Sequence, residues 1–287
     1  MKKRILCFGE ILWDMLPEGK VLGGAPLNVL FHAQQNGLQG KMISGIGVDD
    51  LGREIKDRCA ALNLSLELVQ EHEDYPTGVA DVSLDENGSA SYELVQPVAY
   101  DNIQLQPSQE EHVTSCDAFV FGSLANRGNV TRSTLISLLR KLEENPQCTI
   151  FFDVNLRAPH YDLSVISELM TFANVVKLND EELQKISDFH QISGAEEERM
   201  NGLLLKFNLN GMVCTLGGDG AIYVDNNKIA RVHGKKINLV DTVGSGDAFL
   251  AAFIASYLDG EPISKSLEKA NNLGAFIASK RGAIVTY

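Results

Sequence analysis

The most constraining feature of this sequence is a regular alternation of strand-like and helix-like segments after residue 117. Short apolar runs predict buried strands, and the longer segments between them have helical composition. Such alternation is typical of a doubly wound parallel sheet with right-handed crossovers. We therefore predict an α/β fold with strands at 118–121, 149–154, 175–178 and 212–216, and with helices at 131–144, 163–172, 180–187 and 195–207.

The rest of the chain extends this pattern and adds two hairpins. Residues 77–84 and 89–94 partly alternate around Asn87-Gly88, which is a strong hairpin signal. This hairpin is a flap, part of a small sheet with residues 11–16, or a surface insertion without a role. A second hairpin is expected at residues 221–232. Strands are expected at 5–9, 11–16 and 41–46, a turn-rich loop at 19–26, and helices at 27–35, 49–62, 248–258 and 263–279.

Composition excludes several classes of protein. The formal net charge is −13 and the pI about 4.9, whereas nucleic-acid and anionic-membrane binders present basic surfaces. The five cysteines form no C-x-x-C pair, which favours buried free thiols in a reducing compartment. No apolar run has the length of a signal-peptide core or a membrane span, so we expect a cytoplasmic protein. No repeat or interdomain linker is found, which predicts a single domain over residues 1–287.

Residues 241–249 join a loop to a strongly apolar helix. Gly244, Ser245 and Gly246 stand where the helix begins, and a helix N-terminus has unpaired backbone N–H groups and a partial positive charge. Glycines let the backbone approach an anion closely, so this stretch predicts a phosphate site. Asp247 in the first turn is either a plain cap or, next to a phosphate, a general base for an attacking hydroxyl.

Polar side chains also follow the predicted strands, and ligands of open α/β sheets bind at these carboxyl ends. Asp153, Asn155 and Arg157 occupy every second position, so they should point to one side. The planar guanidinium of Arg157 suits a phosphate or carboxylate, although a surface salt bridge is an equal interpretation. Asn179 and Glu182 either hold a Mg²⁺–phosphate complex through water or form a simple capping box.

Two glycine-rich segments have similar alternatives. Gly23, Gly24 and Asn28 would grip sugar hydroxyls, or they form an ordinary tight turn. A strand–turn–strand segment suits close approach by a nucleotide, or it is a bare turn; it contains Thr215, Gly217, Gly218 and Gly220.

Several other sites are excluded. Residues 45–52 lack the G-x-G-x-x-G spacing of a dinucleotide site and open a helix with an acidic pair. The sequence contains no P-loop, no zinc-type His/Cys spacing and no G-x-S-x-G elbow.

Together, and in this order, these motifs resemble those of the PfkB-type (ribokinase-like) sugar kinases over essentially the whole chain. Residues 23–28 (GGAPLN) look like the N-terminal sugar signature, and residues 45–52 look like the structural G-x-V-G-x-D-x-x-G segment. Residues 241–247 (DTVGSGD) are similar to the C-terminal signature D-T-x-G-A-G-D, with Ser245 in place of the usual alanine. Residues 9–14 look most like those of bacterial fructokinases.

The resemblance implies a three-layer α/β core with a small β lid made of residues 11–22 and 77–94. By analogy, the lids of two subunits pair, so a homodimer is expected. It also implies ATP beneath the turn at residues 217–220, with Asn272 and Ala275 near the adenine. Asn179-x-x-Glu182 matches the N-x-x-E motif that helps to position Mg²⁺ in the family. A potassium site beside the anion-binding turn is a further implication, formed by Asp241, Val243, Ser279 and Gly282.

Our hypothesis from the sequence is therefore a Mg²⁺- and ATP-dependent sugar kinase that converts fructose to fructose 6-phosphate. The resemblance implies that Asp14 binds the sugar together with the Gly23-Gly24 and Asn28 motif, that Asp247 is the base, and that Arg157 bridges sugar and phosphate. The alternatives are 2-keto-3-deoxygluconate or another sugar as the acceptor, and a non-catalytic sugar sensor on the same fold. The lid has few aromatic residues to stack a base, which disfavours a nucleoside kinase.

Overall fold

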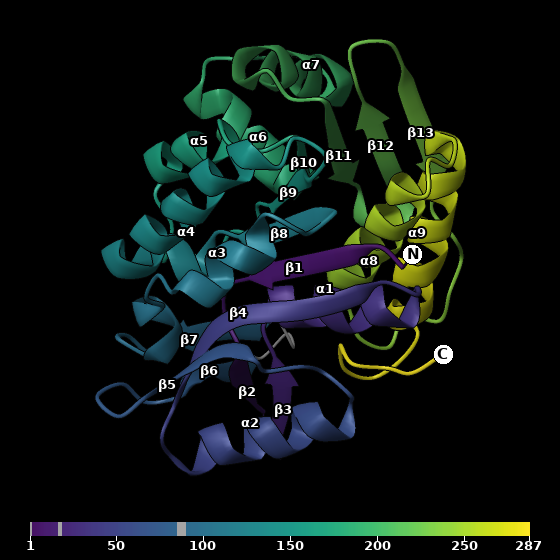
Figure 1. Ribbon diagram of the computed structural model, residues 1–287. Helices are drawn as coiled ribbons and strands as arrows, with labels where there is room; N and C mark the ends of the chain where they lie inside the picture. Colours follow the sequence, from purple (N-terminus) through teal and green to yellow (C-terminus); the bar gives the residue numbers. More distant parts are fainter. Residues whose placement is uncertain (1, 17–18, 85–89) are drawn as a thin grey trace.

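The computed structural model describes residues 2–16, 19–84 and 90–287. Its centre is a nine-stranded sheet (Figure 1). Seven neighbouring strands of this sheet are parallel, and two further strands at one edge pair antiparallel. The α/β prediction is therefore confirmed. From one edge to the other, the strands are β5 (Leu68–His72), β4 (Gln39–Gly47), β1 (Arg4–Phe8), β8 (Ala118–Gly122), β9 (Thr149–Asp153), β10 (Val175–Asn179), β11 (Gly211–Thr215), β12 (Gly220–Val224) and β13 (Ile229–His233).

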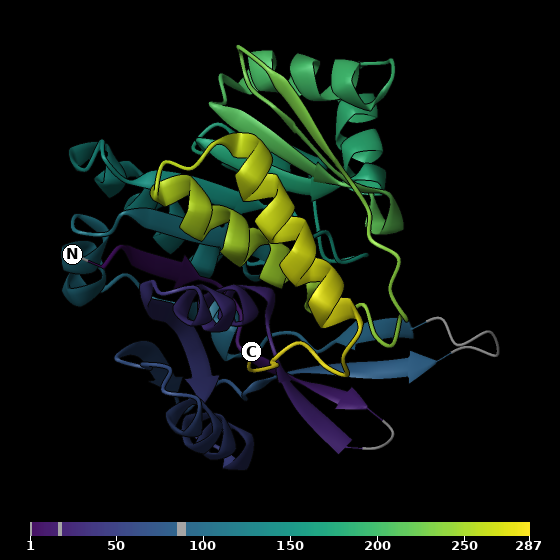
Figure 2. The same cartoon turned by 90° about the vertical axis from the view of Figure 1, so that its right-hand side faces the viewer.

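Helices cover both faces of this sheet, which gives the three predicted layers (Figure 2). One apolar cluster joins the sheet to α1 (Ala25–Gln35), α2 (Asp50–Ala61), α8 (Ser245–Leu258) and α9 (Ile263–Ala278). The other joins it to α3 (Pro107–Val113), α4 (Asn129–Lys141), α5 (Leu163–Met170), α6 (Asp180–Phe189) and α7 (Glu196–Phe207).

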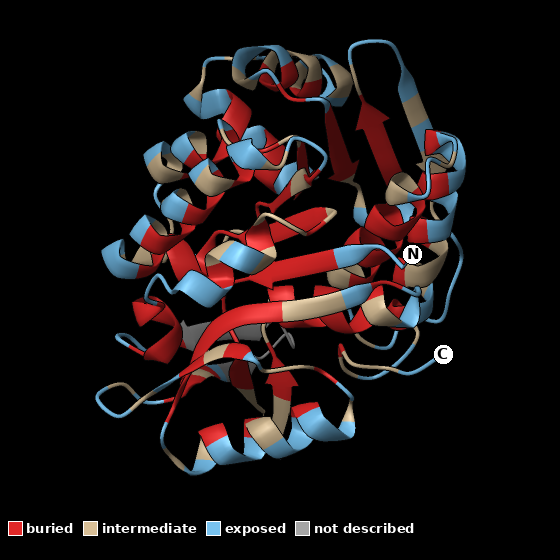
Figure 3. Ribbon diagram, in the orientation of Figure 1, coloured by how far each residue is buried: buried red, intermediate tan, exposed pale blue. Residues whose placement is uncertain are grey.

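The central strands are apolar because both of their faces are covered (Figure 3). Every residue of β8 is buried, and the rings of Phe121 and Phe152 stack across β8 and β9 with centroids 4.7 Å apart. Helix α8 is buried from Ala248 to Ser256, between the sheet, α1 and α9. A helix that is apolar on all sides needs such surroundings, so the sequence of α8 already specifies its central place.

A second, four-stranded sheet forms the predicted lid, in the order β3 (Gly19–Gly23), β2 (Leu12–Leu16), β6 (Gly78–Leu84) and β7 (Ala90–Leu94). The hairpin and its pairing with residues 11–16 are as predicted, and β2 runs parallel to β6. The expected turn at Asn87-Gly88 lies outside the described residues. Figure 2 shows this sheet projecting beyond the main sheet.

Two strands and one α-helix were not predicted. The loop expected at residues 19–26 is wrong in part, because residues 19–23 pair with β2 as strand β3 despite the glycines at both of its ends. Strand β5 and helix α3 are short, and their mixture of polar and apolar residues gives no clear period. No helix among the described residues is long and apolar enough to cross a membrane.

A buried ion pair ties the loops on the α3–α7 side together. Arg127 donates from Nε to Asp101 Oδ1 and from Nη2 to Oδ2, both at 2.8 Å, and its guanidinium lies over the ring of Tyr100. The two charged side chains are only 4% and 5% exposed. Losing one partner would leave the other charge buried and uncompensated.

We therefore expect Arg127→Ala to lower the free energy of unfolding by about 3–5 kcal/mol, as measured by urea denaturation. The matched control is Lys141→Ala, which removes an ion pair with Glu144 that lies at the surface. That variant should unfold at the same urea concentration as the parent. Equal stability of Arg127→Ala and Lys141→Ala would contradict the assignment.

Candidate active site

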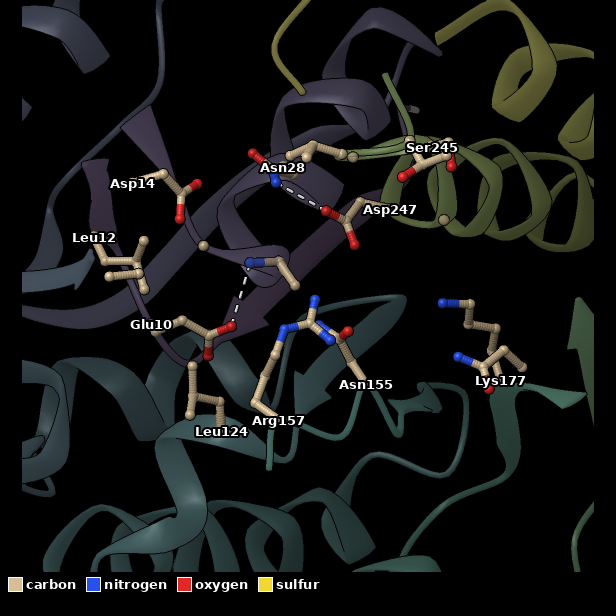
Figure 4. Close-up of a pocket in the computed structure, with 18 of the residues that line it drawn as sticks. Glu10, Leu12, Asp14, Asn28, Leu124, Asn155, Arg157, Lys177, Ser245 and Asp247 are labelled. Carbon is tan, nitrogen blue, oxygen red and sulfur yellow. Dashed lines mark hydrogen bonds between the residues drawn. The ribbon is translucent and has the colours of Figure 1, made fainter. Parts of the chain in front are cut away.

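A cavity of about 340 Å³ lies between the carboxyl ends of the central strands, the N-termini of α1 and α8, and the lid sheet (Figure 4). Its lining unites motifs that lie far apart in the chain. The predicted residues that line it are Asp14, Gly24, Asn28, Arg157, Asn179, Glu182, Thr215, Val243, Gly244, Ser245, Gly246 and Asp247.

The N-terminus of α8 forms one wall of this cavity. Gly244 precedes the helix with φ of 76°, and a Cβ there would overlap Ala283. Both observations explain the glycine. Ser245 N–H donates to Thr242 O at 3.2 Å, whereas the N–H groups of Gly246 and Asp247 have no acceptor within the helix. The turn therefore presents free donors and the positive end of the helix dipole to the cavity.

Asp247 lies next to these donors and has a carboxyl group that resists ionisation. Burial, and to a smaller extent the charge of Asp153, raise the pKa of Asp247 to about 6, although Lys177, Asn28 and Arg157 oppose the shift. Asn28 Nδ2 donates to Asp247 Oδ2 at 2.8 Å and fixes its orientation. A carboxylate with a raised pKa and a fixed position at a ligand cavity has the properties of a general base.

The opposite end of the cavity is acidic. Asp14, on β2, has a pKa raised to about 6 by burial, and its carboxylate touches Gly23, where a Cβ would overlap it. Gly24, with φ of 110°, lies against the backbone carbonyl of Glu10. The side chain of Glu10 is 2% exposed and accepts the N–H of Ala25 at 3.2 Å. Burial raises the pKa of Glu10 to about 7.

Two charged residues of the site were missed by the sequence reasoning. Glu10 was read only as part of a family motif, and Lys177 was read only as part of an apolar strand. Lys177 is buried and donates to Asp153 Oδ1 at 2.9 Å, and a Cβ on Gly246 would lie 3.2 Å from its Nζ. A lysine inside the run Val175-Val176-Lys177-Leu178 was the available signal, because lysine is buried only when it is paired.

Asn155 and Arg157 extend from the end of β9 into the cavity, as their alternation predicted (Figure 4). Asn155 has φ of 40°, a left-handed conformation that asparagine tolerates better than most residues. Arg157 is exposed, and its Nη1 donates to the carbonyl of Leu156. Asp153 instead pairs with Lys177 beneath the cavity.

Asn179 and Glu182 form the capping box that starts α6. Glu182 N–H donates to Asn179 Oδ1 at 2.8 Å, and Asn179 N–H donates to Glu182 Oε2 at 2.9 Å. Glu182 Oε1 also accepts the N–H of Leu156 at 2.8 Å. Each carboxylate oxygen keeps a further lone pair, so capping does not prevent Glu182 from also binding a hydrated cation. No cluster of three or more metal-ligating side chains occurs in the described part of the chain.

The residues expected to bind the nucleotide divide into two groups. Gly217 and Gly218 form an exposed turn after β11, and a Cβ on either would meet no atom within 4 Å. Gly220 is constrained differently, because a Cβ there would overlap Val232 O on β13. Asn272 and Ala275, on α9, are half-buried and do not line the described cavity.

The residues expected around potassium surround Asp241. Its Oδ1 accepts the N–H of Val243 and its Oδ2 accepts the N–H of Gly282, both at 3.0 Å. The hydroxyl of Ser279 donates to Phe276 O at the end of α9, at 2.7 Å, whereas the potassium ligands expected near Ser279 and Gly282 are backbone carbonyls. The potassium site stays a prediction.

Comparison with known proteins identifies the family. The model of the pfkB family carbohydrate kinases matches residues 17–287. The chain belongs to this family. A sugar kinase of Pyrococcus horikoshii is 29% identical over 298 residues, which cover 97% of this chain and 91% of the relative. The fructokinase of Salmonella typhimurium is 26% identical over 310 residues, which cover 99% and 96%.

Solved structures agree with this family assignment. The structure of the Pyrococcus horikoshii sugar kinase in complex with ATP has a TM-score of 0.85 at 27% identity and covers 98% of this chain and 94% of that one. A fructokinase from Xylella fastidiosa with bound ATP has a TM-score of 0.87 at 21% identity, with 99% and 94% covered. The fold is therefore the ribokinase-like fold of PfkB kinases, and the protein is a sugar kinase.

The raised pKa of Asp247 leads to a stability prediction. Between its ordinary pKa of 3.8 and about 6, the folded carboxyl keeps a proton that the unfolded chain has lost, so the Asp247 contribution disfavours folding as the pH rises. Asp247→Asn removes this cost and should raise the Tm at pH 8 by a few degrees, with little difference at pH 4. Calorimetry at both pH values measures this. A variant less stable than the parent at pH 8 would contradict it.

Proposed function

We propose that this PfkB kinase transfers the γ-phosphoryl group of ATP to the primary hydroxyl of D-fructose and forms fructose 6-phosphate. The observation that carries the proposal is the position of Asp247, next to the free N–H groups that begin α8 and within a hydrogen bond of Asn28. The site thereby combines a proton acceptor and an anion-binding turn, the two groups that this chemistry needs. The fructokinase named above, 26% identical, supports the choice of acceptor.

The charges of the cavity support a neutral polyhydroxy acceptor. Glu10, Asp14 and Asp247 provide carboxylates, which accept hydrogen bonds from sugar hydroxyls. Arg157 is the cation on that side, and we assign it to the oxygens between sugar and phosphate. A sugar acid such as 2-keto-3-deoxygluconate would bring a fourth carboxylate to this end. The negative charge of the sugar acid would be repelled by the carboxylates at this end of the cavity, which favours fructose over the acid. Gly23, Gly24 and Asn28 complete the sugar site.

In the proposed reaction, the oxygen of the sugar hydroxyl bonds to the γ-phosphorus of ATP while Asp247 accepts the proton of that hydroxyl. The bond from this phosphorus to the bridging oxygen breaks, and ADP leaves. The free N–H groups at Gly246 and Asp247, with the nearby Lys177, stabilise the charge on the transferred group, whereas the Ser245 N–H expected to share this role already donates to Thr242 O. The lid sheet excludes water, so that the sugar hydroxyl attacks instead of water.

ATP would lie along the open turn at Gly217 and Gly218, after Thr215, and towards Asn272 and Ala275. Mg²⁺ would supply charge neutralisation of the phosphates, and it keeps several waters when bound. Asn179 and Glu182 fit that need, because Glu182 lines the cavity and retains free lone pairs beside its capping bonds. A potassium ion at Asp241 and pairing of two subunits through the lid remain proposals from the resemblance. A cytoplasmic location remains a proposal from the sequence.

The first test is ADP release with Mg²⁺, K⁺ and ATP against fructose, ribose, tagatose, 2-keto-3-deoxygluconate and adenosine. We expect the largest kcat/KM with fructose, and preference for another acceptor would contradict the assignment of fructose. Asp247→Ala should lower kcat at least ~10²-fold, the lower range for loss of a general base. The control is Asp259→Ala at the exposed far end of α8, which should keep parental turnover.

The pH profile gives a second test. The base must be ionised to accept the proton, and the pKa of Asp247 is raised to about 6. The kcat/KM for the sugar should therefore fall as the pH drops from about 7, where Glu10 titrates, through about 6, where Asp14 and Asp247 titrate, and should be constant at higher pH until another group titrates. A profile that is flat down to pH 4.5 would exclude Asp247 as the base.

A further inference from the structure

The turn that begins α8 is supported from behind by the segment that follows α9. Ala283 is 1% exposed and packs so closely against Gly244 that any Cβ at Gly244 would overlap it. The same segment is bonded to the loop before α8, because Asp241 accepts the N–H of Gly282 at 3.0 Å. The position of Ala283 therefore determines the position of the anion-binding turn.

His32, on α1, holds this segment in place. It is fully buried, and its Nε2 lies 2.8 Å from the carbonyl oxygen of Ala283. A carbonyl oxygen only accepts, so Nε2 carries the proton and donates. Nδ1 lies 3.3 Å from the hydroxyl of Tyr287, whose ring stacks on the imidazole with centroids 5.8 Å apart. Burial lowers the pKa of His32, which agrees with a neutral ring.

Helix α1 thus reaches the reaction site at two points. Asn28 donates to Asp247 directly, at 2.8 Å, and His32 acts through Ala283 on Gly244. Residues 28 and 32 are four apart, so both side chains leave the same face of α1. One helix, α1, therefore contacts both the proposed proton acceptor, Asp247, and the segment that supports the phosphate-binding turn at Gly244.

We propose that His32 is a positioning residue for phosphoryl transfer, acting through its hydrogen bond to the Ala283 carbonyl to fix the turn at Gly244. The inference rests on the proposed role of that turn in binding the transferred group. Contacts that are stronger in the transition state than in the substrate complex change kcat, and they have little effect on the affinity for the substrate. Loss of the His32 donor should therefore lower kcat and leave the KM for the sugar nearly unchanged.

The test compares two substitutions of similar size. His32→Leu fills the space without a donor, whereas His32→Gln places an amide N–H at a similar distance from the backbone. We expect His32→Leu to lower kcat between about tenfold and 10²-fold, the cost of a misplacement of about 1 Å, while the sugar KM changes little. His32→Gln should restore most of the loss. Tyr287→Phe, which keeps the stacked ring, should retain parental kcat.

A second measurement separates positioning from packing. The affinity for ADP with aluminium fluoride, which mimics the transferred phosphoryl group, should fall in His32→Leu by a factor similar to that in kcat. The proposal is overturned if folded His32→Leu keeps parental kcat. It is also overturned if His32→Gln loses as much activity as His32→Leu. Should His32→Leu not fold, His32→Asn, whose shorter side chain withdraws the amide from Ala283, replaces it in the comparison.

These experiments use the sugar on which the parent is most active. Failure of fructose as the acceptor would then overturn the acceptor assignment without affecting the test of His32. The kcat of His32→Leu and its affinity for ADP with aluminium fluoride would then be compared with those of the parent protein, with the other sugar as the acceptor.

Discussion

The site depends on one physical constraint, which is the start of the strongly apolar helix α8 at the carboxyl edge of a parallel sheet. Helix α8 is buried from Ala248 to Ser256, which holds its partly exposed N-terminus against the cavity. Its first N–H groups then need an acceptor, and the cavity supplies a place for an anion. The same burial raises the pKa of Asp247 towards neutrality. Packing of the core and the raised pKa of Asp247 are thus consequences of one arrangement.

An acidic protein can still bind phosphates because local charges and dipoles, and not the net charge, determine the potential in a cavity. The chain has a formal charge of −13. Within the cavity, however, Lys177 lies beside the turn at Gly246, and the dipole of α8 adds positive potential there. The carboxylates of Glu10 and Asp14 gather at the other end. Under the proposed function, this separation of charge distinguishes the end of the cavity assigned to the phosphates from the end assigned to the sugar.

Much of the fold could be predicted from the sequence, because alternating strand and helix patterns and the apolar composition of α8 are local signals. The lid hairpin was visible for the same reason. Strand β3 was missed because its residues carry glycines and become a strand only by pairing with β2. The motifs around Asn28, Asn179 and Asp247 were recognisable, but taken one at a time each had a plain structural alternative, and only the fold shows that all three line one cavity. Lys177 gave a local signal, a lysine within an apolar strand, but its pairing with Asp153 and the burial of Glu10 depend on contacts distant in sequence.

The most direct measurement is a crystal structure of the complex with fructose, ADP, Mg²⁺ and aluminium fluoride. The account predicts the fluoride group within hydrogen-bond distance of the backbone N–H groups at Gly246 and Asp247, and the primary hydroxyl of fructose against the Asp247 carboxylate. A complex in which the fluoride group lies away from the start of α8, or in which Asp247 makes no contact with the sugar hydroxyl, would contradict the central claim.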